Sequence, residues 1–137
     1  MVESAGATDF SVNAGGDIVT RGGPAAGRPW RVGIRHPHRP DRLAAVLAVR
    51  DLSVATSAAY ERGDHILVPA THRPPAGLVS LTVVGPSLTY ADAFATAAFA
   101  MGRDGVAWLA DRPSYEALAI TDDDRLVWTP GMDALLA

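Results

Sequence analysis

Residues 78–102 read LVSLTVVGPSLTYADAFATAAFAMG. The first seven residues are rich in β-branched side chains and stop at Gly85-Pro86, a pattern that predicts a strand over residues 78–84. The segment from Tyr90 to Gly102 predicts one short helix, with Gly102 just beyond its end. The sequence therefore predicts a strand that leads directly into a helix.

Two polar side chains interrupt the apolar surface of this predicted helix. Asp92 and Thr96 are four residues apart, so they lie one turn above the other on the same face. Every other position from Ala91 to Met101 is small or apolar, so the helix is expected to be buried and its polar groups to be satisfied by neighbours or by a ligand. A structural role stays open, because threonine bonds back to the i−4 carbonyl and aspartate favours a helix N-terminus. The oxygen pair also suits a hard divalent cation such as Mg²⁺.

The rest of the chain contains short apolar segments between turn-forming clusters, which predict strands. These strands cover residues 10–13, 18–20, 30–35, 52–56, 65–68, 117–121 and 125–129. A further helical turn or two is expected over 104–110, and residues 41–49 are predicted as a short helix or a link between strands. The elements do not follow strict βαβ alternation. The sequence therefore predicts an α+β fold, with a mixed or antiparallel sheet and flanking helices, as one domain over residues 1–137.

Composition excludes several classes of protein. The net charge of −3 gives no broad basic surface for nucleic acid. The absence of cysteine removes disulfides, thiolate catalysis and cysteine-based zinc sites. No apolar run approaches the ~20 residues that a membrane-spanning helix needs. The first ten residues lack the basic start and the apolar core of a signal peptide, so a cytoplasmic location is expected.

A series of six segments carries a family resemblance. They are Asn13-Ala-Gly-Gly-Asp-Ile18, Trp30-Arg-Val-Gly-Ile34, Val54-Ala-Thr-Ser57, His65-Ile-Leu-Val-Pro69, Ser80-Leu-Thr-Val-Val-Gly-Pro86 and Ala91-Asp-Ala-Phe-Ala-Thr-Ala97. Each segment alone is weak evidence, but their order and spacing resemble the C-terminal half of the ApbE family, the FAD:protein FMN transferases. The resemblance covers residues 13–102 and implies an ApbE-like fold.

The resemblance implies a reaction and roles for individual residues. Enzymes of this family bind FAD with Mg²⁺ and transfer its FMN half to a threonine or serine hydroxyl of an acceptor flavoprotein, releasing AMP. Asp92 and Thr96 match the family's Ala-Asp-x-x-x-Thr motif, whose Asp and Thr bind the metal. His65 matches a histidine proposed to help deprotonate the acceptor hydroxyl, and an ordinary histidine pKa suits that work.

The resemblance also implies which residues form the flavin side of the site. The Gly-Gly turn and the Val-Ala-Thr-Ser loop lie there in the family. The corresponding residues in this chain are Gly15, Gly16, Asp17, Thr56 and Ser57. Without the resemblance, paired glycines are more often a plain turn than a phosphate cradle.

The chain departs from the family pattern in one loop and in length. After His-Ile the family usually has an Asp-Pro-Arg-Thr-Gly type sequence, whereas this chain has Val68-Pro-Ala-Thr-His72. The acid, the arginine and the glycine of that turn are replaced. Family members are much longer, and their N-terminal half carries a Lys-Gly segment, whereas this chain has no lysine. The N-terminal half is therefore expected to be absent from this chain.

Three interpretations of the whole chain stay open. The first is the Mg²⁺-dependent flavin transferase, with FAD as substrate and an acceptor flavoprotein that presents a threonine. The second is a non-catalytic fragment that associates with itself or with a partner, because the loss of half a shared core exposes apolar surface. The third is a module that binds FAD without transferring FMN. Outside these, His36, His38 and His72 are interpreted as solvent-facing rather than as a zinc site.

Overall fold

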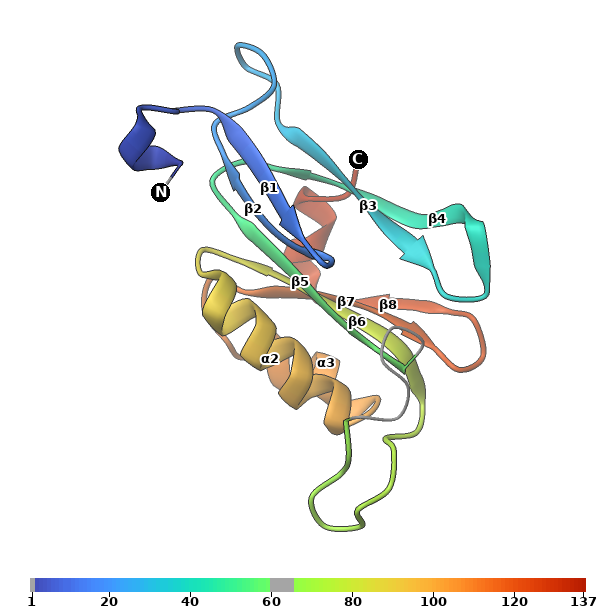
Figure 1. The fold of residues 1–137 in the computed structure, drawn as a ribbon. Coiled ribbons are helices and arrows are strands. Elements are labelled where there is room, and N and C mark those ends of the chain that lie inside the picture. Colours follow the sequence, from blue (N-terminus) through green and yellow to red (C-terminus); the bar gives the residue numbers. More distant parts are fainter. Residues whose placement is uncertain (1, 60–65) are drawn as a thin grey trace.

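The computed structural model describes residues 2–59 and 66–137. Strands and short helices follow one another along the chain (Figure 1). The strands are β1 (Phe10–Ala14), β2 (Asp17–Arg21), β3 (Trp30–His36), β4 (Arg39–Val49), β5 (Ser53–Ala58), β6 (Leu78–Gly85), β7 (Glu116–Thr121) and β8 (Leu126–Trp128). The helical elements are η1 (Glu3–Ala5), α2 (Leu88–Ala100), α3 (Asp104–Ala110) and η2 (Pro130–Ala134).

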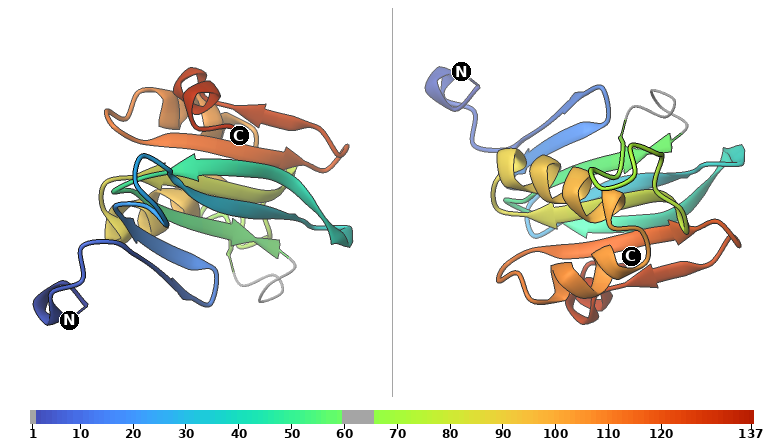
Figure 2. Two further views of the ribbon diagram at one scale, coloured as in Figure 1. Left: turned by 90° about the horizontal axis from the view of Figure 1, so that it is seen from above. Right: turned by 90° about the horizontal axis from the view of Figure 1, so that it is seen from below.

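The strands of the described residues form two antiparallel sheets. The larger sheet has the order β1-β2-β5-β6-β7-β8, and β3 pairs with β4 in the smaller one. Each strand pairing is antiparallel. The helices α2 and α3 cover one face of the larger sheet, while the β3–β4 hairpin and η2 lie on the other (Figures 1 and 2). The predicted α+β class is confirmed, with the antiparallel form of the sheet.

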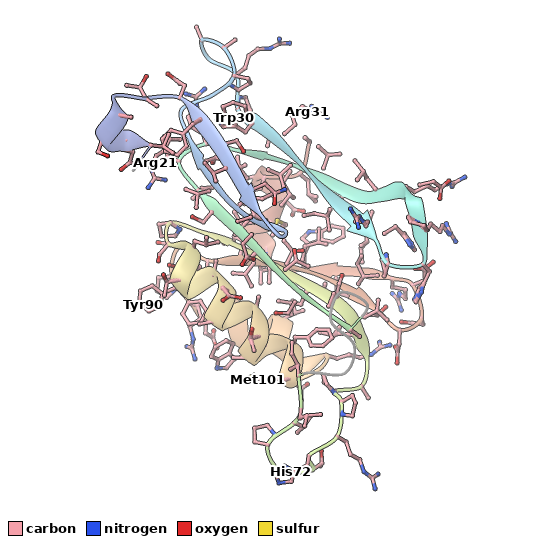
Figure 3. All side chains as sticks on the ribbon, viewed as in Figure 1. Arg21, Trp30, Arg31, His72, Tyr90 and Met101 are labelled. Carbon is pink, nitrogen blue, oxygen red and sulfur yellow. The ribbon has the colours of Figure 1, made fainter. Side chains whose placement is uncertain are left out.

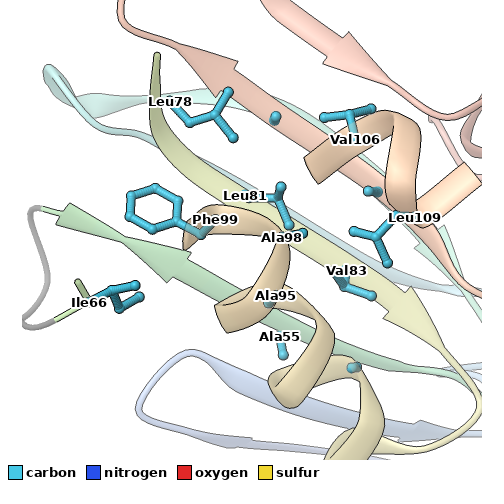
Figure 4. Packing of buried hydrophobic residues seen from close by; sticks show 13 residues of the cluster. Ala55, Ile66, Leu78, Leu81, Val83, Ala95, Ala98, Phe99, Val106 and Leu109 are labelled. Atoms are coloured by element: carbon cyan, nitrogen blue, oxygen red, sulfur yellow. The ribbon is translucent and has the colours of Figure 1, made fainter. Parts of the chain in front are cut away.

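The larger sheet is the middle layer, so its central strand β6 is buried on both faces. Leu81 and Val83 pack under α2 and α3, together with helix residues such as Ala95 and Leu109 (Figure 4). Val84 points the other way, into a second cluster with residues of β3 and β4. Burial on both faces is the reason that this strand reads as an almost continuous apolar run in the sequence.

Helix α2 ends where the sequence predicts but begins at Leu88, two residues before the predicted start at Tyr90. Pro86 has no backbone N–H to donate to a neighbouring strand, so β6 ends before it. Ser87 occupies the N-cap position of α2 in an extended conformation, although its side chain makes no capping hydrogen bond. Gly102 has a φ of +64°, and its N–H donates to the carbonyl of Phe99 at 3.0 Å. A left-handed glycine of this kind ends the helix.

The expectation that residues 41–49 form a short helix or a link is wrong. They belong to β4, which pairs with β3 from Trp30↔Val49 onward. Leu47 and Val49 are fully buried against the larger sheet. The segment is rich in alanine and leucine, which favour a helix locally, but burial and pairing of alternate residues decide the outcome.

The remaining element predictions are largely confirmed. The β7–β8 hairpin closes the sheet, with Asp122 to Asp124 at its turn. The helix over 104–110 is α3. The strand expected over 65–68 begins outside the described residues. Within them, Val68 forms an isolated bridge with Arg73, and the loop up to Gly77 projects from the sheet with His72 near its tip (Figures 1 and 3).

Candidate functional site

A pocket of about 600 Å³ opens between α2 and the end of β5. Its walls come from the β1–β2 turn, from β5, from the segment after residue 65, and from α2. Its lining residues are Gly15, Asp17, Thr56, Ser57, Ala58, Ile66, Leu67, Pro69, Asp92, Thr96, Ala97 and Ala100. Segments far apart in the sequence thus contribute to one concave surface, as is typical of a ligand site.

Asp92 and Thr96 both line this pocket. The buried face of α2 is formed by Ala91, Ala95, Ala98 and Phe99. Asp92 and Thr96 are exposed, so the expectation of a buried helix is wrong for this face. The reason is that β5 covers only part of α2, and the two polar side chains stand on the part that faces the pocket.

The strand β5 carries the opposite wall of the pocket. Ser57 faces α2, and its Oγ lies 3.4 Å from Thr96 Oγ1. Thr56 points to the other face of the sheet, where its Oγ1 lies 2.8 Å from Thr82 Oγ1. β2 pairs with β5 only through Ile18↔Val54 and the adjacent residues, so β5 runs on past the β1–β2 turn and forms the pocket wall there.

The Gly15-Gly16 turn brings the β1–β2 hairpin to this wall. Gly15 and Gly16 have φ values of +66° and +102°, and the Gly16 N–H donates to Asn13 Oδ1 at 3.0 Å. A Cβ at Gly15 would meet nothing within 4 Å, so the backbone conformation rather than space requires glycine. Gly15 and Asp17 line the pocket, whereas Gly16 lines a neighbouring cavity of about 130 Å³ that shares Thr56 with it.

His65 lies outside the described residues. The next residue, Ile66, is buried and lines the pocket together with Leu67 and Pro69. The sequence prediction did not include this apolar side of the pocket. Of these apolar lining residues, Ala100 could have been predicted from the sequence. It follows Asp92 and Thr96 at the same four-residue spacing and therefore lies on the same face of α2.

The other histidines divide into two groups. His36 is not solvent-facing as expected, since its Nε2 lies 3.0 Å from an Asp124 carboxylate oxygen and its side chain is largely covered. The contact joins the β3–β4 hairpin to the β7–β8 turn. His38 and His72 are exposed. Within the described residues, no group of three or more His, Asp or Glu side chains is placed to hold a metal ion.

The donor set of the pocket fits a hard cation that keeps open positions. Asp92 offers a carboxylate and Thr96 a hydroxyl from one helix face, and Asp17 lines the same pocket. Oxygen donors of this kind suit Mg²⁺, which binds through few protein groups and takes water and phosphate oxygens for the rest. The residues present therefore fit the metal that the resemblance implies.

Comparison with known proteins identifies the family. A sequence model described as "ApbE family" matches residues 1–119. The chain belongs to the ApbE family. FAD:protein FMN transferases from Rhodobacter capsulatus and Treponema pallidum are 36% and 38% identical to it, over 97% and 85% of this chain. The aligned regions make up 27% and 35% of the lengths of these two relatives.

Solved structures of the family have the same fold. The ApbE protein of Thermotoga maritima superposes with a TM-score of 0.84 at 30% identity, over 94% of this chain and 45% of that one. The flavin transferase ApbE of Vibrio cholerae gives a TM-score of 0.82 at 30% identity, over 98% and 47%. This ApbE-family chain thus spans less than half of the relatives that it matches, and it aligns with their C-terminal part.

Among the described residues, the helices are all too short or too polar to cross a bilayer.

Proposed function

We propose that this chain carries the metal-binding part of a Mg²⁺-dependent flavin transferase, which moves FMN from FAD to a threonine hydroxyl of an acceptor flavoprotein and releases AMP. The observation that carries the proposal is the meeting of Asp92, Thr96 and Ser57 in one pocket of an ApbE-family chain. The names of the relatives supply the reaction class, and the donor set in this chain supports the metal.

In this proposal Asp92 and Thr96 hold Mg²⁺, which supplies charge neutralisation to the pyrophosphate when bound. Gly15 and Asp17 line the nucleotide side together with Thr56 and Ser57, and Gly16 completes the same turn from the neighbouring cavity. The positive φ values of the glycines let the turn approach a ligand without a side chain in the way. Ile66, Leu67 and Ala100 give the pocket an apolar side that suits the flavin ring.

The transfer itself is a displacement at phosphorus. The acceptor threonine oxygen forms a bond to the phosphorus of the FMN half, the bond from that phosphorus to the bridging oxygen breaks, and AMP leaves with that oxygen. The hydroxyl proton passes to a base, for which we propose His65. Such transfers depend on positioning and on electrostatic stabilisation of the phosphoryl oxygens.

We further propose that residues 1–137 behave as one domain. Both apolar clusters share the strands of the larger sheet, with Val83 in one and Val84 in the other. A unit in which one strand belongs to both cores is expected to unfold in one step. The second candidate function is FAD binding without transfer, favoured by the pocket itself, whose polar and apolar sides suit the binding of a nucleotide whether or not transfer follows.

The test is AMP release from FAD by the purified chain with Mg²⁺ and a threonine-bearing acceptor protein. The matched control is Asp92→Ala, an exposed position at which the substitution is expected to change stability by no more than about 0.5 kcal/mol. Release that disappears in the control supports transfer through this pocket. FAD binding without AMP release supports the second candidate, and neither binding nor release by the folded chain contradicts both.

A further inference from the structure

Charge is distributed very unevenly along this chain. The segment from Arg28 to Arg50 holds six arginines and one acid, Asp41, and therefore carries a charge of +5. The whole chain carries −3, which leaves −8 on all other residues. One segment of an acidic protein is thus strongly basic, and this segment is the β3–β4 hairpin with its flanks.

The geometry of β3 places these arginines on an outer surface. Val32 and Ile34 are buried in the apolar cluster beneath the hairpin. Alternation along the strand turns Arg31 and Arg35 away from that cluster, and both are exposed. Arg31 lies at the start of β3, on the side of the molecule remote from α2 (Figure 3).

An exposed leucine lies on the same surface. Leu43 pairs with Arg35 across the hairpin, and 58% of its surface is accessible. Its side chain covers Gly33, where an added Cβ would lie 2.8 Å from Leu43 Cδ1. Gly33 stands between the two arginines of β3, so the leucine lies between their side chains. Arg28 shares a shallow hollow with Arg31 and Ala48. We call the surface of Arg28, Arg31, Arg35 and Leu43 the arginine face.

The charges of the arginine face are not neutralised within the part of the chain that the structure describes. The ion pairs there involve Arg21, His36, Arg39 and Arg103, and none involves Arg28, Arg31 or Arg35. Guanidinium groups bind carboxylates in a planar, bidentate geometry. The face is therefore complementary to an acidic group from another molecule.

The arginine face also adjoins the candidate site. Arg35 lines the cavity of about 130 Å³ that contains Asn13 and Gly16. Thr56 belongs both to this cavity and to the main pocket. The end of β3 that carries Arg35 thus lies near the pocket.

We propose that the arginine face binds an acidic, extended segment of the acceptor protein, an inference that rests on the proposed function. The acceptor must reach the pocket, and the Arg35 end of the face lies near it. A long nucleic acid would meet the −8 charge on the rest of the chain, whereas a short acidic segment meets mainly the local positive charge. A membrane is disfavoured because Leu43 is the one apolar residue that the face offers for insertion.

The experiment uses a fluorescein-labelled peptide of alternating glutamate and serine with a central Leu-Thr, and the same peptide with glutamine in place of glutamate. Fluorescence anisotropy measures binding to the chain at low salt, without FAD and without Mg²⁺. The glutamate peptide is expected to bind more tightly, and its affinity to fall as salt is added. The double variant Arg31→Gln/Arg35→Gln is expected to bind it about fivefold more weakly, since an exposed charge pair contributes about 0.5 kcal/mol.

The matched control is Arg112→Glu, which also lowers the net charge by two. Arg112 stacks over Trp108 on the opposite layer of the molecule, so this variant is expected to bind the peptide like the unmodified chain. Equal loss in both variants, equal binding of the two peptides, or binding only to vesicles of anionic lipid would overturn the proposal. Self-association of the chain through the arginine face would also overturn it. This would appear as a molar mass that rises with protein concentration, together with loss of peptide binding. The peptide-binding assay contains no FAD, so its result does not depend on flavin transfer. Failure of the proposed function would instead appear as absent AMP release in the separate FAD assay.

Discussion

The Ser57 Oγ and the Thr96 Oγ1 lie 3.4 Å apart and join β5 to α2 at the pocket. Ser57 is buried, while Thr96 is exposed to the pocket. A hydroxyl has one donor and two acceptor positions, so Thr96 can keep its contact with Ser57 and still offer a lone pair to a cation. The contact with Ser57 therefore orients the hydroxyl that we propose binds the metal, and it leaves a lone pair of that hydroxyl available.

Replacement of this hydroxyl is predicted to weaken metal binding. Thr96→Val keeps the shape of the side chain but removes its oxygen, so affinity for Mn²⁺, used as a Mg²⁺ probe, is expected to fall about 10-fold to 100-fold. Thr96→Ser keeps the oxygen and is the matched control. Electron paramagnetic resonance of free Mn²⁺ in the presence of FAD measures both. Equal affinity in the valine and serine variants would remove Thr96 from the metal site.

Much of the architecture was predictable because local and tertiary preferences agree. Residues 78–84 are rich in β-branched side chains and are buried on both faces of the sheet, so propensity and packing both favour a strand. Residues 41–49 show the opposite case, in which alanine and leucine favour a helix but pairing with β3 produces β4. A pairing partner that precedes the segment in the sequence cannot be read from the segment itself.

The candidate site was predictable only where its residues share an element or a family motif. Asp92 and Thr96 share one helix face, so their spacing alone brings them together. Their meeting with Ser57 depends on how α2 lies on β5, and no local pattern encodes it. The contact between His36 and Asp124 likewise joins two hairpin ends that are remote in sequence.

The close approach of α2 and α3 gives a prediction about stability. A Cβ on Gly105 would lie 2.0 Å from the carbonyl oxygen of Ala98 and 2.6 Å from its carbonyl carbon, and these backbone atoms cannot move aside as a flexible side chain could. Gly105→Ala is therefore expected to lower the free energy of unfolding by about 2 kcal/mol, although alanine is the better helix former. Urea unfolding measures the change. Ala107→Gly, an exposed position on the same helix, controls for propensity and is expected to cost about 1 kcal/mol. A stabilised Gly105→Ala variant would contradict the steric argument.

A buried hydroxyl in β6 gives a prediction of opposite sign. Ser80 Oγ is buried and has no hydrogen-bond partner within the described residues. Ser80→Ala removes this unpaired group, so the free energy of unfolding is expected to stay level or to rise by about 1 kcal/mol. Thr82→Val on the same strand face is the contrast, because it leaves Thr56 Oγ1 without its 2.8 Å partner and is expected to destabilise the chain. Thermal unfolding of the two variants compares them directly, and a Ser80→Ala variant less stable than Thr82→Val would contradict the assignment.

Asp9 gives a prediction about pH. The Gly23 N–H donates to Asp9 Oδ1 at 3.0 Å and Thr8 donates to Oδ2 at 2.8 Å. These bonds, the Gly23 bond above all, hold the pKa of Asp9 below its ordinary value of 3.8. A depressed pKa in the folded chain means that the carboxylate stabilises the fold above the unfolded pKa. This contribution is lost as the pH falls through the lower folded value.

Asp9→Asn is therefore expected to flatten the acid limb of the stability curve. The amide can still accept from Gly23, but it does not titrate, so its variant should lose less stability than the unmodified chain as the pH falls from about 5 to below 3.8. Urea unfolding at a series of pH values gives the slope. Asp111→Asn, at an exposed position just after α3, makes the same change in charge and is expected to retain the slope of the unmodified chain. Parallel curves for Asp9→Asn and the unmodified chain below pH 3.8 would show that the Gly23 bond does not stabilise the fold through the charge of Asp9.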